Sequence, residues 1–216
     1  MRLTVTTFVS LDGVLQSPGG PQEDPSDGFG LGGWLVPYVD EGFGGIAGPW
    51  FDDADAFLLG RRTHQLMAAH WPLVTDPADT AATKLNSLPK YVPSTTGQVA
   101  DWAGTQVLTG DLAAEVTALK QLPGRALQVH GSGRLVRSLL AHDLVDELRL
   151  LTFPVVLGRG KRLFEPGTVP AAWRLTDVRS TPAGVIGHTY AFAGRPAAGD
   201  IGIDADGREE LLSVSS

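Results

Sequence analysis

Apolar residues follow two different periods along the first two thirds of the chain. Residues 3–9 alternate at every second position, as expected for a strand with one buried face. Short apolar runs predict further strands at residues 55–60, 90–94, 105–108 and 126–130. Apolar residues three and four positions apart predict helices over 62–69, 112–121 and 134–141. Strands and helices therefore alternate, which predicts an α/β fold with a mostly parallel central sheet.

The pattern changes after residue 141. Residues 147–153, 173–179 and 185–192 read as strands without helices between them, and 181–184 (Thr-Pro-Ala-Gly) predicts a tight turn. An antiparallel hairpin should therefore end the sheet, whose two faces are covered by helices. A Gly-rich helical pattern also covers 35–46. We expect one domain over residues 1–193, followed by 194–216 as a flexible tail or dimer arm.

Composition narrows the possible chemistry. The chain has no cysteine, which excludes disulfides and thiolate chemistry and fits a cytoplasmic protein. A formal net charge of −7 argues against nucleic acid as a partner. No apolar stretch approaches the ~20 residues that span a membrane. The five histidines have no metal-ligand spacing, so no metal site is expected.

The first candidate binding motif lies where the strand at 55–60 meets its helix. Gly60 ends the strand, and Arg61, Arg62 and Thr63 begin the helix. A helix N-terminus offers free N–H groups to an anion, and arginine adds charged donors that suit a phosphate. The competing interpretation is a pair of solvated arginines at an ordinary helix start, which the motif alone does not exclude.

The second candidate motif is the glycine turn after the strand at 126–130. Gly131, Ser132 and Gly133 precede a helix that starts near Arg134, so the backbone could approach a pyrophosphate closely. The alternative is a tight turn with no ligand. Val136 occupies the position of the third glycine of a full dinucleotide fingerprint.

Together, these motifs resemble the dihydrofolate reductase-like family, in the branch of RibD C-terminal (riboflavin-biosynthesis reductase-like) proteins. The segments that carry the resemblance are residues 8–14, 59–63, 91–95, 130–135, 144–150 and 154–164. They occur in the family's order along the chain. One departure is that Ser132 follows Gly131 where dihydrofolate reductases carry two glycines.

The resemblance implies a dihydrofolate reductase-like fold and NADPH as the hydride donor. It implies a small-molecule substrate, a pteridine- or ribosylaminopyrimidine-like heterocycle. The cofactor-binding residues that it implies are Leu11, Val14, Gly60, Arg61, Arg62, Thr63, Ser94, Thr95, Gly131, Ser132, Gly133, Arg134 and Leu135. Asp12, Asp40 and Glu41 are the candidate catalytic proton donors, with water as the alternative.

Two further functions remain open at this point: a non-catalytic nucleotide-binding protein of the same fold, and a flavin-binding oxidoreductase. The resemblance also implies a homodimer. Residues 148–157 are apolar on both faces of the predicted strand, and an uncovered apolar face usually marks an interface.

Overall fold

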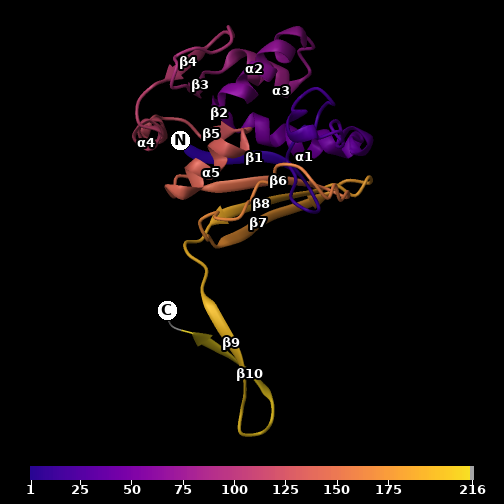
Figure 1. Cartoon of the computed structure of the whole chain (residues 1–216), viewed down its shortest axis with the longest axis vertical. Helices are drawn as coiled ribbons and strands as arrows, with labels where there is room; N and C mark the ends of the chain where they lie inside the picture. Colours follow the sequence, from indigo (N-terminus) through magenta and orange to yellow (C-terminus); the bar gives the residue numbers. More distant parts are fainter. Residues whose placement is uncertain (215–216) are drawn as a thin grey trace.

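The computed structural model describes residues 1–214, which form a central sheet covered by helices and a separate C-terminal hairpin (Figure 1). The strands of the sheet are β1 (Arg2–Ser10), β2 (Ala54–Leu58), β3 (Lys90–Pro93), β4 (Thr105–Leu108), β5 (Ala126–Val129), β6 (Glu147–Phe153), β7 (Trp173–Ser180) and β8 (Ile186–Phe192). Their order is β4-β3-β2-β5-β1-β6-β8-β7. β8 runs antiparallel to β6 and β7, and the other pairs are parallel. The predicted mostly parallel sheet with an antiparallel end is confirmed.

Helices cover both faces of this sheet. The α-helices are α1 (Glu41–Asp52), α2 (Arg61–His70), α3 (Thr80–Ser87), α4 (Leu112–Gln121) and α5 (Gly133–Ala141). Short 3-10 turns cover Ser26–Gly28, Val36–Tyr38 and Trp71–Leu73. α4 and α5 bury their apolar stripes against one face of the sheet, where Leu139 is fully buried. α1, α2 and α3 contribute to the cores on the other face, through Trp50, Met67 and Leu85 respectively.

The helix predicted over 35–46 is wrong in its position. Residues 36–38 form only a 3-10 turn, and α1 runs from Glu41 to Asp52. The start is set by Asp40, whose carboxylate accepts hydrogen bonds from the backbone N–H groups of Gly42 and Phe43 at 3.0 and 3.1 Å. Such capping satisfies donors that the first helical turn leaves free.

Sequence patterning also missed α3. Its N-cap, Asp79, accepts from the Ala82 N–H at 2.9 Å, but the helix buries only Ala82 and Leu85. An eight-residue helix with two buried side chains gives little periodic signal.

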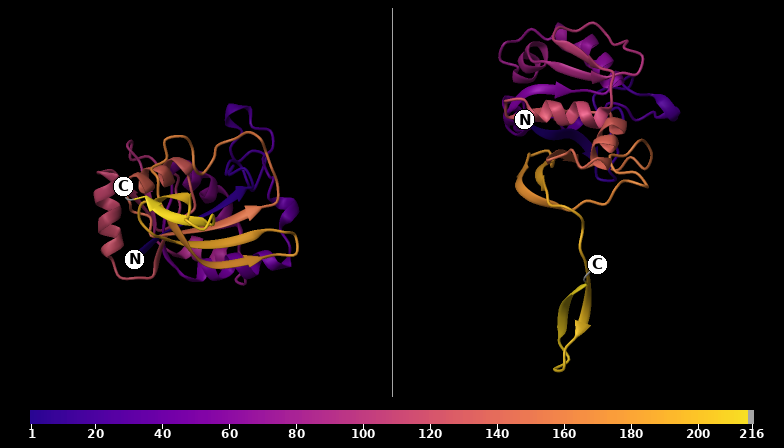
Figure 2. Two further views of the ribbon diagram at one scale, coloured as in Figure 1. Left: turned by 90° about the horizontal axis from the view of Figure 1, so that it is seen from below. Right: turned by 90° about the vertical axis from the view of Figure 1, so that its left-hand side faces the viewer.

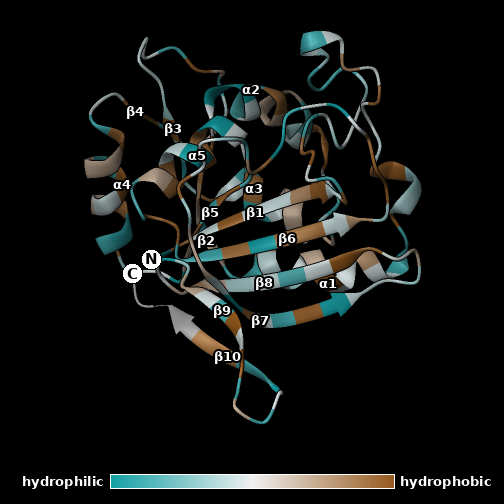
Figure 3. Cartoon of the chain, turned by 60° about the horizontal axis from the view of Figure 1, so that its bottom comes forward, coloured by the Kyte–Doolittle hydropathy of each residue, from teal (hydrophilic) through white to brown (hydrophobic). Residues whose placement is uncertain are grey.

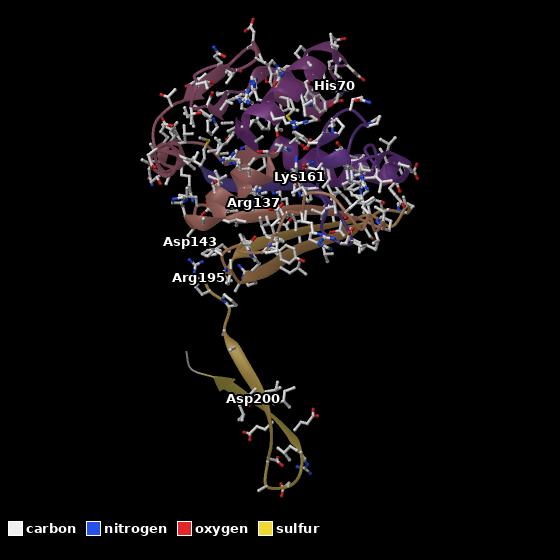
Figure 4. All side chains as sticks on the ribbon, viewed as in Figure 1. His70, Arg137, Asp143, Lys161, Arg195 and Asp200 are labelled. Carbon is white, nitrogen blue, oxygen red and sulfur yellow. The ribbon has the colours of Figure 1, made fainter. Side chains whose placement is uncertain are left out.

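The segment expected to be a flexible tail or dimer arm contains a second, two-stranded sheet. β9 (Ala198–Ile203) pairs antiparallel with β10 (Glu209–Val214), with Ile201 opposite Leu211. The hairpin stands away from the body (Figures 1 and 2). An ion pair between Arg195 and Asp143, with nitrogen–oxygen distances of 2.7 and 2.8 Å, holds the start of the arm to the body (Figure 4). Residues 215–216 of the predicted tail lie outside the described part.

The strand within the segment 148–157, expected to expose an apolar patch, is largely covered in the fold. β6 is an interior strand between β1 and β8, and Leu148, Leu151 and Phe153 are buried. Within residues 148–157, Val156 is 66% exposed, and outside this segment the outer hairpin of the sheet also exposes Leu175 and Val178 in β7 and Ile186 in β8. The strand periodicity could not reveal which strand lies at the edge, because that depends on strand order.

Residues 1–214 contain neither a membrane-spanning helix nor a cluster of metal-binding side chains. None of the helices has the length and apolar character that crossing a membrane requires. Nor are three or more His, Asp or Glu side chains grouped so that they could share a metal ion.

Candidate functional site

A cleft of about 550 Å³ opens at the carboxyl ends of β1 and β5. Its walls come from the ends of these strands, the loop over residues 15–24, the first turns of α2 and α5, and residues 161–163. The volume lies within the range typical of small-molecule sites, about 300–1,000 Å³. In α/β sheets ligands bind outside the carboxyl ends of the strands, so this cleft is the candidate site.

Two glycine-containing turns meet at one end of the cleft. The Gly60 N–H donates to the Gly131 carbonyl at 3.0 Å, so the turn before α2 is joined to the turn before α5. A Cβ on Gly60 would lie 2.6 Å from Ser132 Oγ and 2.8 Å from Ser132 N. Gly131 has φ of +118°, a conformation that favours glycine, and the Gly131–Ser132 peptide bond is cis.

The first turns of both helices are available to an anion. Neither N-cap residue, Gly60 for α2 or Ser132 for α5, makes a side-chain capping hydrogen bond. The N–H groups of each first turn therefore keep their donor capacity, and the helix dipole places partial positive charge there. Arg62 and Thr63 from α2, and Gly133 and Arg134 from α5, line the cleft. This combination fits the phosphates of a nucleotide.

Charged residues of both signs line the middle of the cleft. Asp24 bridges it: its carboxylate pairs with Arg62 at 2.9 Å and with Lys161 at 2.7 Å. Burial raises the pKa of Asp24, but hydrogen bonds from Lys161 and Ser26 outweigh this effect and hold the pKa below its usual value. Asp24 is therefore a carboxylate that keeps two cations in place.

Two further ionisable residues line the cleft. Arg137, on α5 and labelled in Figure 4, pairs with Glu165 at 3.1 Å. Glu23 accepts from the Gly19 N–H at 2.8 Å. Burial raises the pKa of Glu23 against the lowering effect of hydrogen bonds from the neighbouring backbone.

The cofactor-binding residues that the resemblance implies are only partly brought together. Those that line the cleft are Arg62, Thr63, Gly131, Ser132, Gly133 and Arg134. Gly60 does not line the cleft, but its N–H donates to the carbonyl of Gly131 in the glycine turn. Val14 and Leu135 are buried and are not among the lining residues, whereas Leu11 is exposed. Leu15, next to Val14, lines the cleft in its place.

Arg61, Ser94 and Thr95 lie beyond the cleft wall. Arg61 and Thr95 are exposed, and Ser94 is buried with its hydroxyl donating to the Gln98 carbonyl at 3.3 Å. They follow the adjacent parallel strands β2 and β3, so they lie at the same edge of the sheet as the two glycine turns.

The three candidate catalytic carboxylates do not line the cleft. Asp12 accepts from Ser10 Oγ at 2.7 Å, from the Gly158 N–H at 2.9 Å and from Arg162 at 3.1 Å. Burial raises the pKa of Asp12, but these bonds and that from the Leu157 N–H hold it far below its usual range. Asp12 is therefore an ionised carboxylate that joins the turn after β1 to the loop over residues 157–162.

Asp40 and Glu41 lie at the start of α1. The Asp40 carboxylate accepts from the Ala183 N–H at 2.7 Å in addition to capping the helix. The Ala183 bond is the main reason that the pKa of Asp40 is lowered. Glu41 is exposed in the first turn. The sequence placed these residues near the site by their position in the chain, but no residue of α1 lines the cleft.

Sequence reasoning assigned no role to four charged residues of the cleft: Glu23, Asp24, Arg137 and Lys161. Glu23 and Asp24 lie in a loop without periodicity, and Arg137 is one polar position of an amphipathic helix. Lys161 lies in the segment 154–164, which resembles the family. That resemblance was the signal in the sequence that could have pointed to Lys161 as a site residue. Their convergence depends on loops that meet only in the folded chain.

Comparison with known proteins finds similar sequences. The family model described as RibD C-terminal domain matches residues 2–186. The uncharacterized protein YyaP of Bacillus subtilis (strain 168) is 28% identical over 195 residues, covering 89% of this chain and 96% of the relative.

Solved structures share the fold. A protein from Shewanella sp. PV-4 named as a putative riboflavin biosynthesis protein superposes with a TM-score of 0.62 at 21% identity, covering 89% of this chain and 99% of the other. Dihydrofolate reductase from Enterococcus faecalis, in complex with NADP(H), gives 0.53 at 14% identity, covering 88% and 96%. The predicted dihydrofolate reductase-like fold is confirmed.

Proposed function

Because the chain belongs to the RibD C-terminal domain family, we propose that it is an NADPH-dependent reductase acting on a small heterocycle. The substrate would be pteridine- or ribosylaminopyrimidine-like. The observation that carries the proposal is the junction of two uncapped helix N-termini with Arg62 and Arg134 in one cleft. The complex of Enterococcus faecalis dihydrofolate reductase with NADP(H) supports the choice of cofactor.

Residues of the cleft have separate tasks in this proposal. The first turns of α2 and α5 would bind the pyrophosphate, with Thr63 and Gly131 at their contact. NADPH would supply the hydride, and the protein would orient donor and acceptor. Leu15 and Leu163 would help to exclude water from the reacting atoms.

The source of the proton is assigned differently from the expectation based on sequence. Glu23 lines the cleft and its burial raises its pKa, so it retains a proton to higher pH than an exposed glutamate. Asp12, Asp40 and Glu41 lie outside the cleft. We therefore place Glu23, or water held beside it, in the role of proton donor.

The direct test is oxidation of NADPH, followed by its near-ultraviolet absorbance, with a panel of pteridines, flavins and ribosylated pyrimidines. Turnover with one class identifies the substrate type. NADPH binding without turnover on any member would favour the non-catalytic alternative. A purified protein that is yellow would point to a bound flavin instead.

NADPH is expected to bind at least tenfold more tightly than NADH. Arg61, Ser94 and Thr95 lie at one edge of the sheet, and Arg62 is on the adjacent wall of the cleft. One charge-assisted bond to a 2′-phosphate contributes about 1.5–3 kcal/mol, and 1.4 kcal/mol is about tenfold. Calorimetric titration of both cofactors measures the ratio.

The substitutions Arg61→Gln and Arg62→Gln test the contribution of each arginine separately. Replacing an arginine that contacts the 2′-phosphate should lower the affinity for NADPH and leave the affinity for NADH unchanged. Arg179→Gln, an exposed position in β7, is the control for a general change in charge. Equal affinities of the unmodified protein for the two cofactors would contradict the assignment.

We also propose that the protein is a homodimer and that the β9–β10 arm contributes to its interface. Ile201, Ile203 and Leu211 lie on one face of the hairpin and are exposed. The outer strands of the main sheet expose Leu175 and Val178, and apolar residues of both regions appear in Figure 3. An isolated two-stranded hairpin is marginally stable, and a two-fold pair of copies would cover both surfaces at once.

Light scattering at low micromolar concentration should give a mass about twice the monomer's 22.8 kDa. Truncation after Ala193 should shift the mass to that of the truncated monomer while the far-ultraviolet circular dichroism of the body is retained. A monomeric full-length chain would contradict the dimer. A truncated chain that remains dimeric would limit the interface to the body.

A further inference from the structure

The β9–β10 arm has one apolar face. Side chains alternate between the two faces of a strand, and residues opposite each other in an antiparallel pair share a face. Ile201 and Ile203 of β9 therefore lie on the same face as Leu211, which is opposite Ile201. Glu209, opposite Ile203, adds a carboxylate at the end of this face nearer the turn. We call Ile201, Ile203 and Leu211 the apolar arm face.

The other face of the arm is acidic and partly closed on itself. Asp200 and Glu210 lie on it. Leu212, on the same face, packs over Gly202, since a Cβ on Gly202 would lie 2.9 Å from Leu212 Cδ1. Leu212 is 44% exposed, whereas the residues of the apolar arm face are 63–85% exposed. A sheet with one apolar and one polar face usually buries the apolar one, but nothing within residues 1–214 covers the apolar arm face.

The main sheet has an open apolar surface of its own, on the side that α5 covers. Tyr190 of β8 is opposite Leu148 of β6, and both side chains belong to the core beneath α5. Leu175 of β7 is opposite Tyr190 and so lies on this side. Alternation along β8 and its register with β7 place Val178 and Ile186 on this side too. We call Leu175, Val178 and Ile186, which are 37–55% exposed, the outer sheet patch.

The opposite side of β7 is charged. Arg179 is opposite Gly187, and a Cβ on Gly187 would lie 2.6 Å from Ile46 in α1, so this side faces α1. Arg174 and Asp177 lie on the same side as Arg179. β7 therefore separates apolar from charged side chains although both are exposed. Such a separation in an exposed strand marks the apolar side as an interaction surface.

The chain's own arm leaves the outer sheet patch open. The Ala172 N–H donates to the Gly194 carbonyl at 2.8 Å. The next residue, Arg195, pairs with Asp143 at 2.7 Å, so the start of the arm is fixed to the body. From this anchor the arm extends away from the body (Figure 2). The arm also follows residue 186, where the match to the family model ends, so it is an addition to the matched part of the chain.

We propose that the apolar arm face of one copy docks on the outer sheet patch of a second copy, and that the exchange is reciprocal. Each contact removes two apolar surfaces from water and leaves Asp200 and Glu210 on the solvent side. A two-fold axis forms both contacts at once, because every copy carries one arm and one patch. The inference rests on the proposed homodimer and names the two surfaces of its arm contact. Neither surface includes a residue that lines the cleft.

Cross-linking is a direct test, because the chain has no cysteine of its own. The full-length double variant Ile201→Cys/Val178→Cys is treated with a short bis-maleimide at low micromolar concentration. Most chains should run as a covalent dimer on denaturing electrophoresis, and mass spectrometry should find residue 201 joined to residue 178. A link confined to single chains would mean that the arm folds back on its own body, and that result or the absence of a link would overturn the inference.

Two matched variants test which faces meet. Glu210→Cys/Val178→Cys moves the arm cysteine to the acidic face, and Ile201→Cys/Arg179→Cys moves the sheet cysteine to the α1 side. Each should give no more covalent dimer than the single variant Val178→Cys. Yields equal to that of Ile201→Cys/Val178→Cys would reject the assigned faces.

A double-mutant cycle tests the contact without a cross-linker. Val178→Ser and Ile201→Ser should each weaken dimerisation at least about tenfold, since each removes a buried apolar side chain from both contacts. The double variant should be weakened by less than the product of the two effects, because the two residues share one contact. Arg179→Ser, next to Val178 but on the charged side, should leave dimerisation unchanged. Independent effects of Val178→Ser and Ile201→Ser would show that the two surfaces do not meet.

Light scattering separates failure of this inference from failure of the proposed homodimer. An unmodified chain that is monomeric refutes the homodimer and this contact together. A dimer in which residues 201 and 178 do not cross-link refutes only the docking of the arm. The cross-linked protein should bind NADPH as the unmodified protein does, so the reductase proposal is tested independently.

Discussion

Gly60→Ala is expected to weaken NADPH binding about a hundredfold, equivalent to roughly 2.7 kcal/mol. The new Cβ would lie 2.8 Å from the backbone nitrogen of Ser132, which cannot rotate away as a side chain can. The turns before α2 and α5 would have to separate, with loss of the bond from the Gly60 N–H to Gly131. Calorimetric titration measures the affinity, and overpacking should also lower stability by about 1–3 kcal/mol.

The effect of Gly60→Ala should be steric and not conformational. Gly60 has φ of −60° and ψ of 143°, which alanine adopts readily. Gly44→Ala in α1 is the matched control, because no atom apart from the adjacent residues and the backbone of its own helix lies within 4 Å of its Cβ position. That variant should be unchanged in affinity and slightly more stable, as alanine is in a helix. Normal NADPH affinity in Gly60→Ala would show that the two turns do not form the cofactor site.

Arg149→Leu is expected to destabilise the fold by about 3–5 kcal/mol. The Arg149 guanidinium lies in β6, beneath α1, and pairs with Asp53 at 2.7 Å and with Glu147 at 2.6 Å. Only 7% of its side chain is exposed, so its removal leaves two poorly solvated carboxylates without their main partner. Urea unfolding measures the loss of unfolding free energy, with the same dependence on urea concentration (m-value) used for both proteins.

An exposed ion pair in the same sheet provides the comparison. Arg179 and Asp177, in β7, lie 3.0 Å apart with side chains 56% and 49% exposed. Arg179→Leu should change stability by less than about 1 kcal/mol, because water solvates the remaining carboxylate. Similar losses in the two variants would mean that burial does not set the importance of the Arg149 cluster.

Arg149 also connects stability to the site. Its guanidinium donates to the Trp50 carbonyl at 3.3 Å, the same carbonyl that holds the amide of Gln128. Gln128 in turn fixes the His130 ring. A variant such as Arg149→Lys, which retains charge but not the planar donor set, should therefore loosen the hydrogen-bonded chain to His130 even if the protein still folds.

Local sequence determined most strands of the central sheet, the helices α2, α4 and α5, and the backbone motifs of the cleft. The apolar stripe of α5 and the alternation in β1 arise from residues a few positions apart, so a short window contains the whole signal. The Gly60 and Gly131 turns are likewise local, since each places glycine between a strand and a helix. These features were sufficient to predict the fold class, which the structure confirms.

The three-dimensional arrangement decided what local patterns do not encode. Asp40, an N-cap, fixed the start of α1 by two hydrogen bonds, against a Gly-rich pattern that suggested an earlier start. Asp24 and Lys161 meet across the cleft, although a long stretch of chain separates them. Thr6 lies beside His130 only because β5 pairs with β1 in a specific register. Strand order and register minimise the free energy of the whole chain, so the residues that complete the site can be identified only after it has folded.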